Sequence, residues 1–248
     1  MRPAHHRLTV LGALMLSVAC MASVGCSRIP GRPGPGPDVV RPEEVLDFPT
    51  LYKQNCAACH GTKSKDAASI SLANPVYLAV AGESNLQQAI AKGITGSLMP
   101  PFARSSGGTL TDRQITVLVQ GLIQQWGTPN PLTGQNLPPY VATLPGDATR
   151  GQQAFISSCA RCHGETGEGN SAEAKPGSSK LGSIVNPAYL ALISNQGLRS
   201  FIIAGRPEDG MPDWRSDTAQ PLTDQQITDI VAWLASKRIA DPGQPYRH

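Results

Sequence analysis

The stretch Cys56-Ala57-Ala58-Cys59-His60-Gly61 contains a motif on which the predicted fold depends. The motif occurs again in Cys159-Ala160-Arg161-Cys162-His163-Gly164. A Cys-x-x-Cys-His motif is typical of covalent haem attachment. Each thiol adds to a haem vinyl group as a thioether, and the adjacent imidazole falls beneath the ring and ligates the iron. We therefore predict two covalently attached c-type haems, one for each motif.

Two alternatives use the same cysteines without haem. One is a redox Cys-x-x-Cys pair and the other is half of a zinc site. A redox pair needs no His, yet both copies have one. An all-thiolate zinc site would use both cysteine pairs, but it would leave unexplained the matched methionines described below.

The rest of the composition limits the possible functions. The chain has 248 residues, and its formal net charge is only +3. Loss of Arg2 and Arg7 with the leader described below would leave 19 basic against 18 acidic side chains. A chain so close to neutral gives no support for nucleic-acid binding.

Methionine and histidine are scarce in the chain once the leader is set aside. Three of the five Met and two of the five His lie within the first 25 residues. The remaining His are the two motif histidines and the terminal His248, and the remaining Met are Met99 and Met211. Two haem irons need two further ligands, and two methionines are available.

The N-terminus has the pattern of an export signal. A basic start is followed by the apolar run 8–24, which is too short for a comfortable membrane span. We predict a lipoprotein-type signal peptide over residues 1–25, because the run ends in Ser-Val-Gly-Cys26, which resembles a bacterial lipobox. Cys26 would then be acylated; acylation of Cys20, ordinary secretion and an uncleaved anchor are the alternatives. Residues 26–42 are rich in Pro and Gly and are predicted to be an extended tether.

The remainder of the chain is a tandem repeat. The second motif lies 103 residues after the first, and three later matches share an offset of 112. These matches are Asn74-Pro75 with Asn186-Pro187, Met99-Pro100 with Met211-Pro212, and Leu110-Thr111-Asp112 with Leu222-Thr223-Asp224. We predict domains over residues 43–126 and 148–241, a Pro-rich linker over 127–147 and a tail over 242–248.

Each repeat is predicted to be helical, so the fold class is all-α. Asn74 and Asn186 are expected N-caps, each before a proline at the first helical position. Thr111 and Thr223 begin capping boxes, each with Gln three residues later. Apolar residues then recur at helical spacing, and no alternating strand pattern is evident.

On these motifs the chain resembles two fused small c-type cytochrome domains of the mono-haem, His/Met-ligated class. The resemblance covers residues 43–126 and 150–238. It implies that an N-terminal and a C-terminal helix cross in each domain, with a Gly against an aromatic residue. Gly151 and Trp233 fit this pattern in the second domain. The offsets give Phe48 and Gly121 in the first, so large and small partners are exchanged at conserved volume.

Met99 and Met211 are the predicted second ligands of the two irons. Each has Pro next, which stiffens the strap that presents the sulfur, and each strap begins six residues earlier at Gly93 or Gly205. Ordinary core packing is the alternative role for a lone Met. His/Met coordination raises the reduction potential of a haem. The predicted metal ligands are His60, Met99, His163 and Met211; the predicted haem-binding residues are these four with Cys56, Cys59, Cys159 and Cys162.

Tyr52 and Phe155 are expected to pack against the haems, whereas Phe102 and Trp214, three residues after each Met, would pack against a haem or its strap or fill the core. Arg161 would pair with a propionate or remain solvated.

An iron with both axial positions filled by protein transfers single electrons and does not readily bind substrate. We therefore expect an electron carrier and no enzyme, on the periplasmic side of a bacterial membrane, lipid-anchored or soluble. The resemblance implies redox partners such as a quinol-oxidising complex, a dehydrogenase or a terminal oxidase. Two alternatives are a fixed cytochrome c subunit of a respiratory or dehydrogenase complex and a di-haem oxidoreductase with an openable haem. The last is disfavoured, because it would want a spare His or Cys ligand.

Overall fold

A computed structural model describes residues 36, 39–63, 68–128, 136–169, 182–215 and 220–239. The predicted signal peptide, its lipobox and the C-terminal tail lie outside the described residues. From Pro42 onward the chain forms one unit, to which both haem motifs belong. None of the helices in the described ranges is long and apolar enough to cross a membrane.

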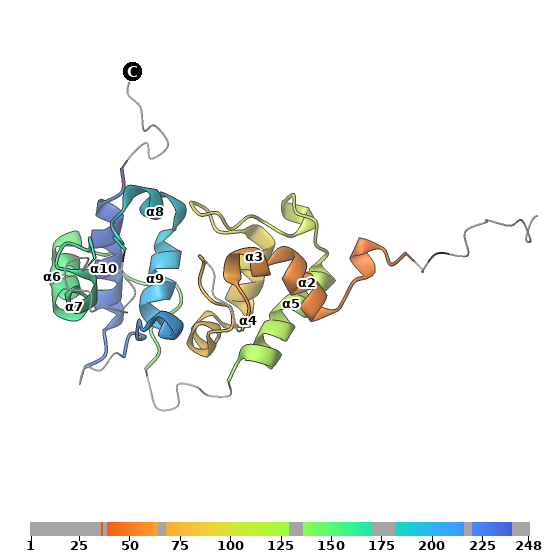
Figure 1. The fold of residues 1–248 in the computed structure, drawn as a ribbon, viewed down its shortest axis with the longest axis horizontal. Helices are drawn as coiled ribbons and strands as arrows, with labels where there is room; N and C mark the ends of the chain where they lie inside the picture. The colour runs from red at the N-terminus through yellow and green to blue at the C-terminus, as the bar shows by residue number, and fades with distance from the viewer. Residues whose placement is uncertain are drawn as a thin grey trace, which may run out of the picture. The chain divides into compact units, whose positions relative to one another are not determined.

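Among its described residues, the first half forms a 3-10 turn followed by four α-helices, two of them long. Figure 1 shows how these helices are arranged. The elements are η2 (Pro42–Glu44), α2 (Phe48–Asn55), α3 (Ala57–His60), α4 (Pro75–Lys92), η3 (Arg104–Ser106) and α5 (Asp112–Trp126). Helix α5 packs against α2 and α4, and the three enclose the first core.

The second half repeats this order with one helix broken in two. Its elements are α6 (Ala148–Ser158), α7 (Ala160–His163), α8 (Pro187–Leu192), α9 (Asn195–Ala204), η4 (Pro207–Asp209) and α10 (Asp224–Ser236). Helix α10 contacts both α6 and α9 (Figure 1). The described residues form no strand beyond isolated bridges, such as those between Ala103 and Leu110 and between Arg206 and Met211, and the predicted all-α class is confirmed.

The break between α8 and α9 corresponds to a kink in α4. Gly82 lies inside α4 with φ of 66°, a left-handed conformation that favours glycine. The offset of 112 residues relates Gly82 to Ser194, which is the N-cap of α9. The helix is therefore kinked at one glycine in the first half, whereas at the same place in the second half one helix ends and a newly capped helix begins.

Helix caps form where the sequence predicts them. The Asn74 side chain accepts from the backbone N–H groups of Val76 and Tyr77, at 2.9 and 3.1 Å. Asn186 does the same for the first residues of α8. The capping boxes Thr111/Gln114 and Thr223/Gln226 are both complete.

The predicted crossing contacts are also confirmed. A Cβ at Gly121 would fall within the ring of Phe48, so α2 and α5 approach closely only because residue 121 is glycine. A Cβ at Gly151 would overlap the backbone carbonyl of Asp229 and lie 2.9 Å from the Cβ of Trp233. Large and small residues are exchanged between the two crossings, as the offsets predict.

Candidate functional site

Each Cys-x-x-Cys-His motif forms a single helical turn, α3 or α7. In the first, the backbone N–H groups of Cys59 and His60 both donate to the carbonyl of Cys56, at 3.2 and 3.0 Å. In the second, Cys162 and His163 donate to Cys159, at 3.1 and 3.0 Å. The motif residues that the sequence predicts to act together are therefore brought together in both halves.

The first cysteine of each motif is buried or half-buried, whereas Cys59 and Cys162 are exposed, and the burial of the first thiol argues against a redox pair. Burial, with a smaller contribution from the neighbouring Cys59, raises the pKa of Cys56 to about 12. Burial likewise raises the pKa of Cys159 to about 11. Reactive cysteines of redox proteins and zinc sites need a lowered pKa, because the thiolate is the active form. A buried neutral thiol fits a group that becomes a thioether.

His60 is oriented by a bond that leaves one ring nitrogen free. Its Nδ1 lies 2.8 Å from the carbonyl oxygen of Ile70 and donates to it. Burial lowers the pKa of His60, and the bond to Ile70 offsets this only in part. The imidazole is therefore neutral, with Nε2 available as an iron ligand.

His163 differs from His60 in this respect. Its pKa is also lowered by burial. Its Nδ1 is buried, and no residue in the described part of the chain accepts a hydrogen bond from it. His60 and His163 thus have the same place in their motifs, but among the described residues only the Nδ1 of His60 has a hydrogen-bond acceptor.

The methionine straps are closed loops that begin at a glycine after a helix. Ile94 donates to the Met99 carbonyl at 3.1 Å, while Arg206 and Met211 exchange two backbone bonds of 2.8 and 2.9 Å. Gly93 and Gly205 have φ of 69° and 66°. A Cβ at these glycines would lie 2.7 Å from the Met99 carbonyl oxygen and 2.6 Å from that of Met211. Glycine is needed twice over, for the left-handed conformation and for the approach of the strap.

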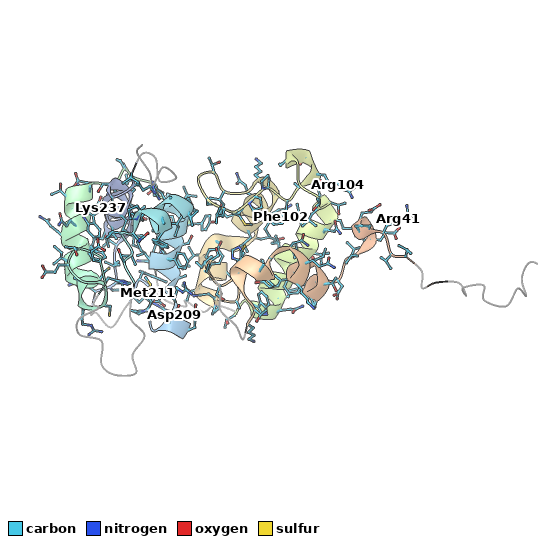
Figure 2. The ribbon with its side chains drawn as sticks, turned by 45° about the horizontal axis from the view of Figure 1, so that its top comes forward. Arg41, Phe102, Arg104, Asp209, Met211 and Lys237 are labelled. Carbon is cyan, nitrogen blue, oxygen red and sulfur yellow. The ribbon has the colours of Figure 1, made fainter. Side chains whose placement is uncertain are left out.

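The two methionines are half-buried, and the contacts of Met99 are the more informative. Met99 packs against the first core, to which Cys56 and Ile70 belong. Met211 lies on its strap beside the acidic turn that contains Asp209 (Figure 2). Ligation by either sulfur remains a prediction.

Aromatic side chains connect each motif to its core. The Tyr52 hydroxyl donates to the Gly61 carbonyl at 2.9 Å, which ties α2 to the turn after His60. Phe155 contacts Trp233, with ring centroids 4.4 Å apart, and lies 6.5 Å from the ring of His163. Phe155 and Trp214 are buried, Phe102 is half-buried, and Arg161 is exposed. Haem contacts of these side chains stay predictions.

The sequence did not predict the support that Arg199 gives. This arginine is almost fully buried, donates to the carbonyls of Pro139 and Tyr140, and pairs with Asp224. It therefore attaches the linker to α9 and α10. The sequence feature that could have indicated this role is the single arginine among the mostly apolar residues 198–204.

Comparison with known proteins gives a separate match for each half. The family described as cytochrome c matches residues 148–237, and the cbb3-type cytochrome c oxidase subunit III family matches residues 44–120. The two halves are cytochrome c domains. Their Cys-x-x-Cys-His motifs fit covalent attachment, and the chain is a di-haem c-type cytochrome with one haem c in each domain.

One curated relative matches about half of the chain, and the chain spans less than half of that relative's length. The cbb3-type cytochrome c oxidase subunit FixPc of Rhizobium leguminosarum bv. viciae is 31% identical over 136 residues, 51% of this chain. The match spans 42% of the length of that relative. The solved reducing HAO-like protein complex of Kuenenia stuttgartiensis has a TM-score of 0.42 at 16% identity, over 82% of this chain and 99% of the matched chain.

Proposed function

We propose that this di-haem cytochrome is an electron carrier, exported and anchored by lipid at a bacterial membrane, that passes single electrons between redox proteins. Bound haem c supplies one-electron chemistry between Fe(II) and Fe(III). The observation that carries the proposal is the repeated pairing of a Cys-x-x-Cys-His turn with a glycine-hinged methionine strap. If His and Met both ligate each iron, neither domain would offer an axial position for substrate.

The protein residues have defined tasks in this proposal. The two thiols of each motif would hold the haem, and the neutral imidazole of His60 or His163 would ligate its iron. The straps would supply Met99 and Met211 as the second ligands, and a soft thioether favours reduced iron.

Opening one axial position at a time tests this assignment. We expect Met99→Ala and Met211→Ala each to retain both haems but to bind carbon monoxide at one reduced haem, which the unmodified protein does not. Each variant should also lose about half of the far-red absorption band that sulfur-to-iron charge transfer gives in the oxidised protein. Leu98→Ala is the matched control, because Leu98 precedes Met99 on the same strap and is 72% exposed. Carbon monoxide binding by the unmodified protein would contradict closed coordination and favour an enzyme with an openable haem.

A second candidate function is a fixed subunit of a cbb3-type oxidase. It is favoured by the match of residues 44–120 to a subunit III family and by the oxidase subunit among the relatives. Purification in mild detergent separates the two functions. A free carrier elutes alone, whereas a subunit elutes with the other oxidase chains at constant ratio.

A further inference from the structure

A side chain of the first domain holds the backbone just before the second methionine strap. The Asn74 amide nitrogen donates to the carbonyl oxygen of Ala204, at 3.0 Å, and the two residues are 6% and 3% exposed. Ala204 is the last residue of α9, and the next residue is Gly205, the hinge of the strap that carries Met211. The two domains are therefore bonded to each other where this strap begins.

The orientation of the Asn74 amide is fixed by its own helix. Its oxygen accepts from the backbone N–H groups of Val76 and Tyr77, at 2.9 and 3.1 Å. Because the oxygen caps α4, the nitrogen is the atom that remains for Ala204. Val76 packs against the core of the second domain and Ala204 belongs to that of the first, so the bond is shielded from water.

Asn74 and α9 together fix one peptide group. The carbonyl of Ala204 and the N–H of Gly205 belong to the same planar peptide unit. The N–H donates to the Phe201 carbonyl at 2.9 Å, and the carbonyl accepts from Asn74. The last carbonyls of a helix have no partner within that helix. The first domain thus supplies a donor that α9 cannot supply for itself.

This peptide group is joined directly to a closed strap. Arg206, the residue after Gly205, exchanges two backbone bonds with Met211, at 2.8 and 2.9 Å. A Cβ at Gly205 would lie 2.6 Å from the Met211 carbonyl oxygen, so the strap also packs against its hinge. A rotation of the peptide group that Asn74 holds would therefore displace the strap, including Met211.

The corresponding place in the first domain is different. The offset of 112 residues relates Asn74 to Asn186, and Ala204 to Lys92 at the end of α4. Asn186 caps α8 with its oxygen, as Asn74 caps α4, but it is exposed. Residues 94–96 of the first strap line a cavity of about 560 Å³ together with Pro187, Leu190 and Ala191 of α8. The first strap thus borders a cavity, whereas the hinge of the second strap is bonded to the opposite domain.

We propose that Asn74 is a positioning residue for Met211, so that iron coordination in the second domain depends on a side chain of the first. The proposal rests on the proposed function, in which Met211 is the second ligand of one haem. Loss of the Asn74 donor should loosen the second strap and leave the first strap unchanged. A thioether ligand favours the reduced iron, so weaker ligation by Met211 should lower the reduction potential of that haem.

Paired aspartate variants of the haem-loaded protein test the proposal. Asn74→Asp keeps the cap acceptor and removes the donor to Ala204, and Asn186→Asp is the matched control. Each is made in the Met99→Ala and Met211→Ala backgrounds, so that the far-red sulfur-to-iron band reports on one strap at a time. In Met99→Ala, we expect Asn74→Asp to weaken the band by about half or more and to lower the potential of the haem that gives it. In Met211→Ala the band should be unaffected by Asn74→Asp, and Asn186→Asp should leave the band unchanged in both backgrounds.

Hydrogen exchange of the straps gives a second measurement, on the backbone itself. Asn74→Asp should speed the exchange of the Arg206 and Met211 amides by about tenfold, because the hinge loses a buried hydrogen bond. The Ile94 amide donates to the Met99 carbonyl in the first strap and should keep its rate.

The two proposals fail in different ways. If neither Met99→Ala nor Met211→Ala alters the far-red band, or if the unmodified protein lacks it, the proposed function is contradicted. If the band assigned to Met211 is the same with and without Asn74→Asp, the positioning role is overturned even where thermal stability falls, since Asn74 would then support folding alone. Where Asn74→Asp does not fold, Asn74→Ser takes its place, because serine caps a helix but is too short to reach Ala204 as well.

Discussion

The two cytochrome domains form the same helix crossing, but the large and the small residue lie on opposite helices. In the first, the ring of Phe48 fills the space over Gly121, so a side chain makes the close contact. In the second, α6 approaches the backbone of α10 at Gly151, and Trp233 supplies the bulk. A side chain can turn away from an intruding atom, whereas a helix backbone cannot. Two contacts that fill the same volume can therefore differ in how well they tolerate an added side-chain atom.

The largest expected effect comes from adding one methyl group at each crossing. We expect Gly151→Ala to destabilise the second domain by about 3 kcal/mol, because its Cβ meets the Asp229 carbonyl and the helices must separate. Gly121→Ala should cost less, about 1 kcal/mol, because the Phe48 ring can shift. Urea unfolding followed by circular dichroism measures both losses. Equal losses would contradict the distinction between side-chain and backbone contact.

The exchange of partners gives this prediction its control. Gly121→Trp alone should destabilise the first domain, and adding Phe48→Gly should recover part of the loss. Hydrogen exchange should place the damage in α2 and α5 and leave α6 and α10 protected. Failure of the second substitution to recover any stability would count against the exchanged pairing.

The second domain also connects α10 to the start of α6 through a buried carboxylate. Asp229 on α10, only 3% exposed, accepts from Arg150 at 2.8 and 3.0 Å and from the backbone of Asp147 at 2.7 Å. Val117 stands at its place in the first domain. Burial raises the pKa of Asp229, but the bonds from Arg150, Asp147 and Gln225 outweigh burial and lower it overall. The carboxylate is thus more stable in the folded protein than in the unfolded chain.

This connection predicts acid sensitivity in one domain. A lowered pKa contributes stability above the unfolded value of about 4, and this stability is lost as the pH falls through the folded value. We expect Arg150→Met to destabilise the second domain at pH 7, because it leaves a buried carboxylate less well paired. The cost should shrink as the pH falls and Asp229 becomes protonated, because a neutral carboxyl gains little from Arg150.

Asp229→Asn is the control for the charge. The bonds from Thr50 lower the pKa of Asp47, so Asp47 also contributes to the pH dependence of stability. Asp47 titrates in both proteins, so its contribution cancels when the stability of the variant is compared with that of the unmodified protein from pH 7 to 3. A constant difference across this range would contradict the assignment of acid sensitivity to Asp229.

Local features of both domains could be predicted from the sequence, because their partners lie a few residues away. The capping box of Thr111 with Gln114 and the cap of Asn74 follow from spacing alone. The crossing of Phe48 with Gly121 could be predicted because the repeat supplied a register. The kink at Gly82 was missed, since a single glycine in an apolar helix gives only a weak signal.

The long-range contacts could not be predicted, because their acceptors are backbone carbonyls. Nothing in the sequence marks the carbonyl of Ile70 as the partner of His60, or those of Pro139 and Tyr140 as partners of Arg199. Every residue carries such an acceptor, so only the folded path selects one. For the same reason, the two identical Asn-Pro motifs could not indicate that Asn74 donates to the carbonyl of Ala204.

The smallest expected effect separates these two asparagines. Asn186→Ala should cost about 1 kcal/mol, the usual loss of an N-cap. Asn74→Ala should cost about 2 kcal/mol, because it also leaves the buried carbonyl of Ala204 without its donor. Aspartate makes the comparison sharper, since it keeps the cap acceptor and lacks the donor.

We expect Asn186→Asp to be neutral or stabilising by a few tenths of a kcal/mol, because a carboxylate at an exposed helix N-terminus interacts favourably with the helix dipole. Asn74→Asp should destabilise the protein, because the same carboxylate would face the Ala204 carbonyl with no proton to share. Thermal unfolding of the two variants at pH 7 measures the difference. If both variants behave alike, the amide of Asn74 contributes nothing beyond its cap, and the two motifs are energetically the same.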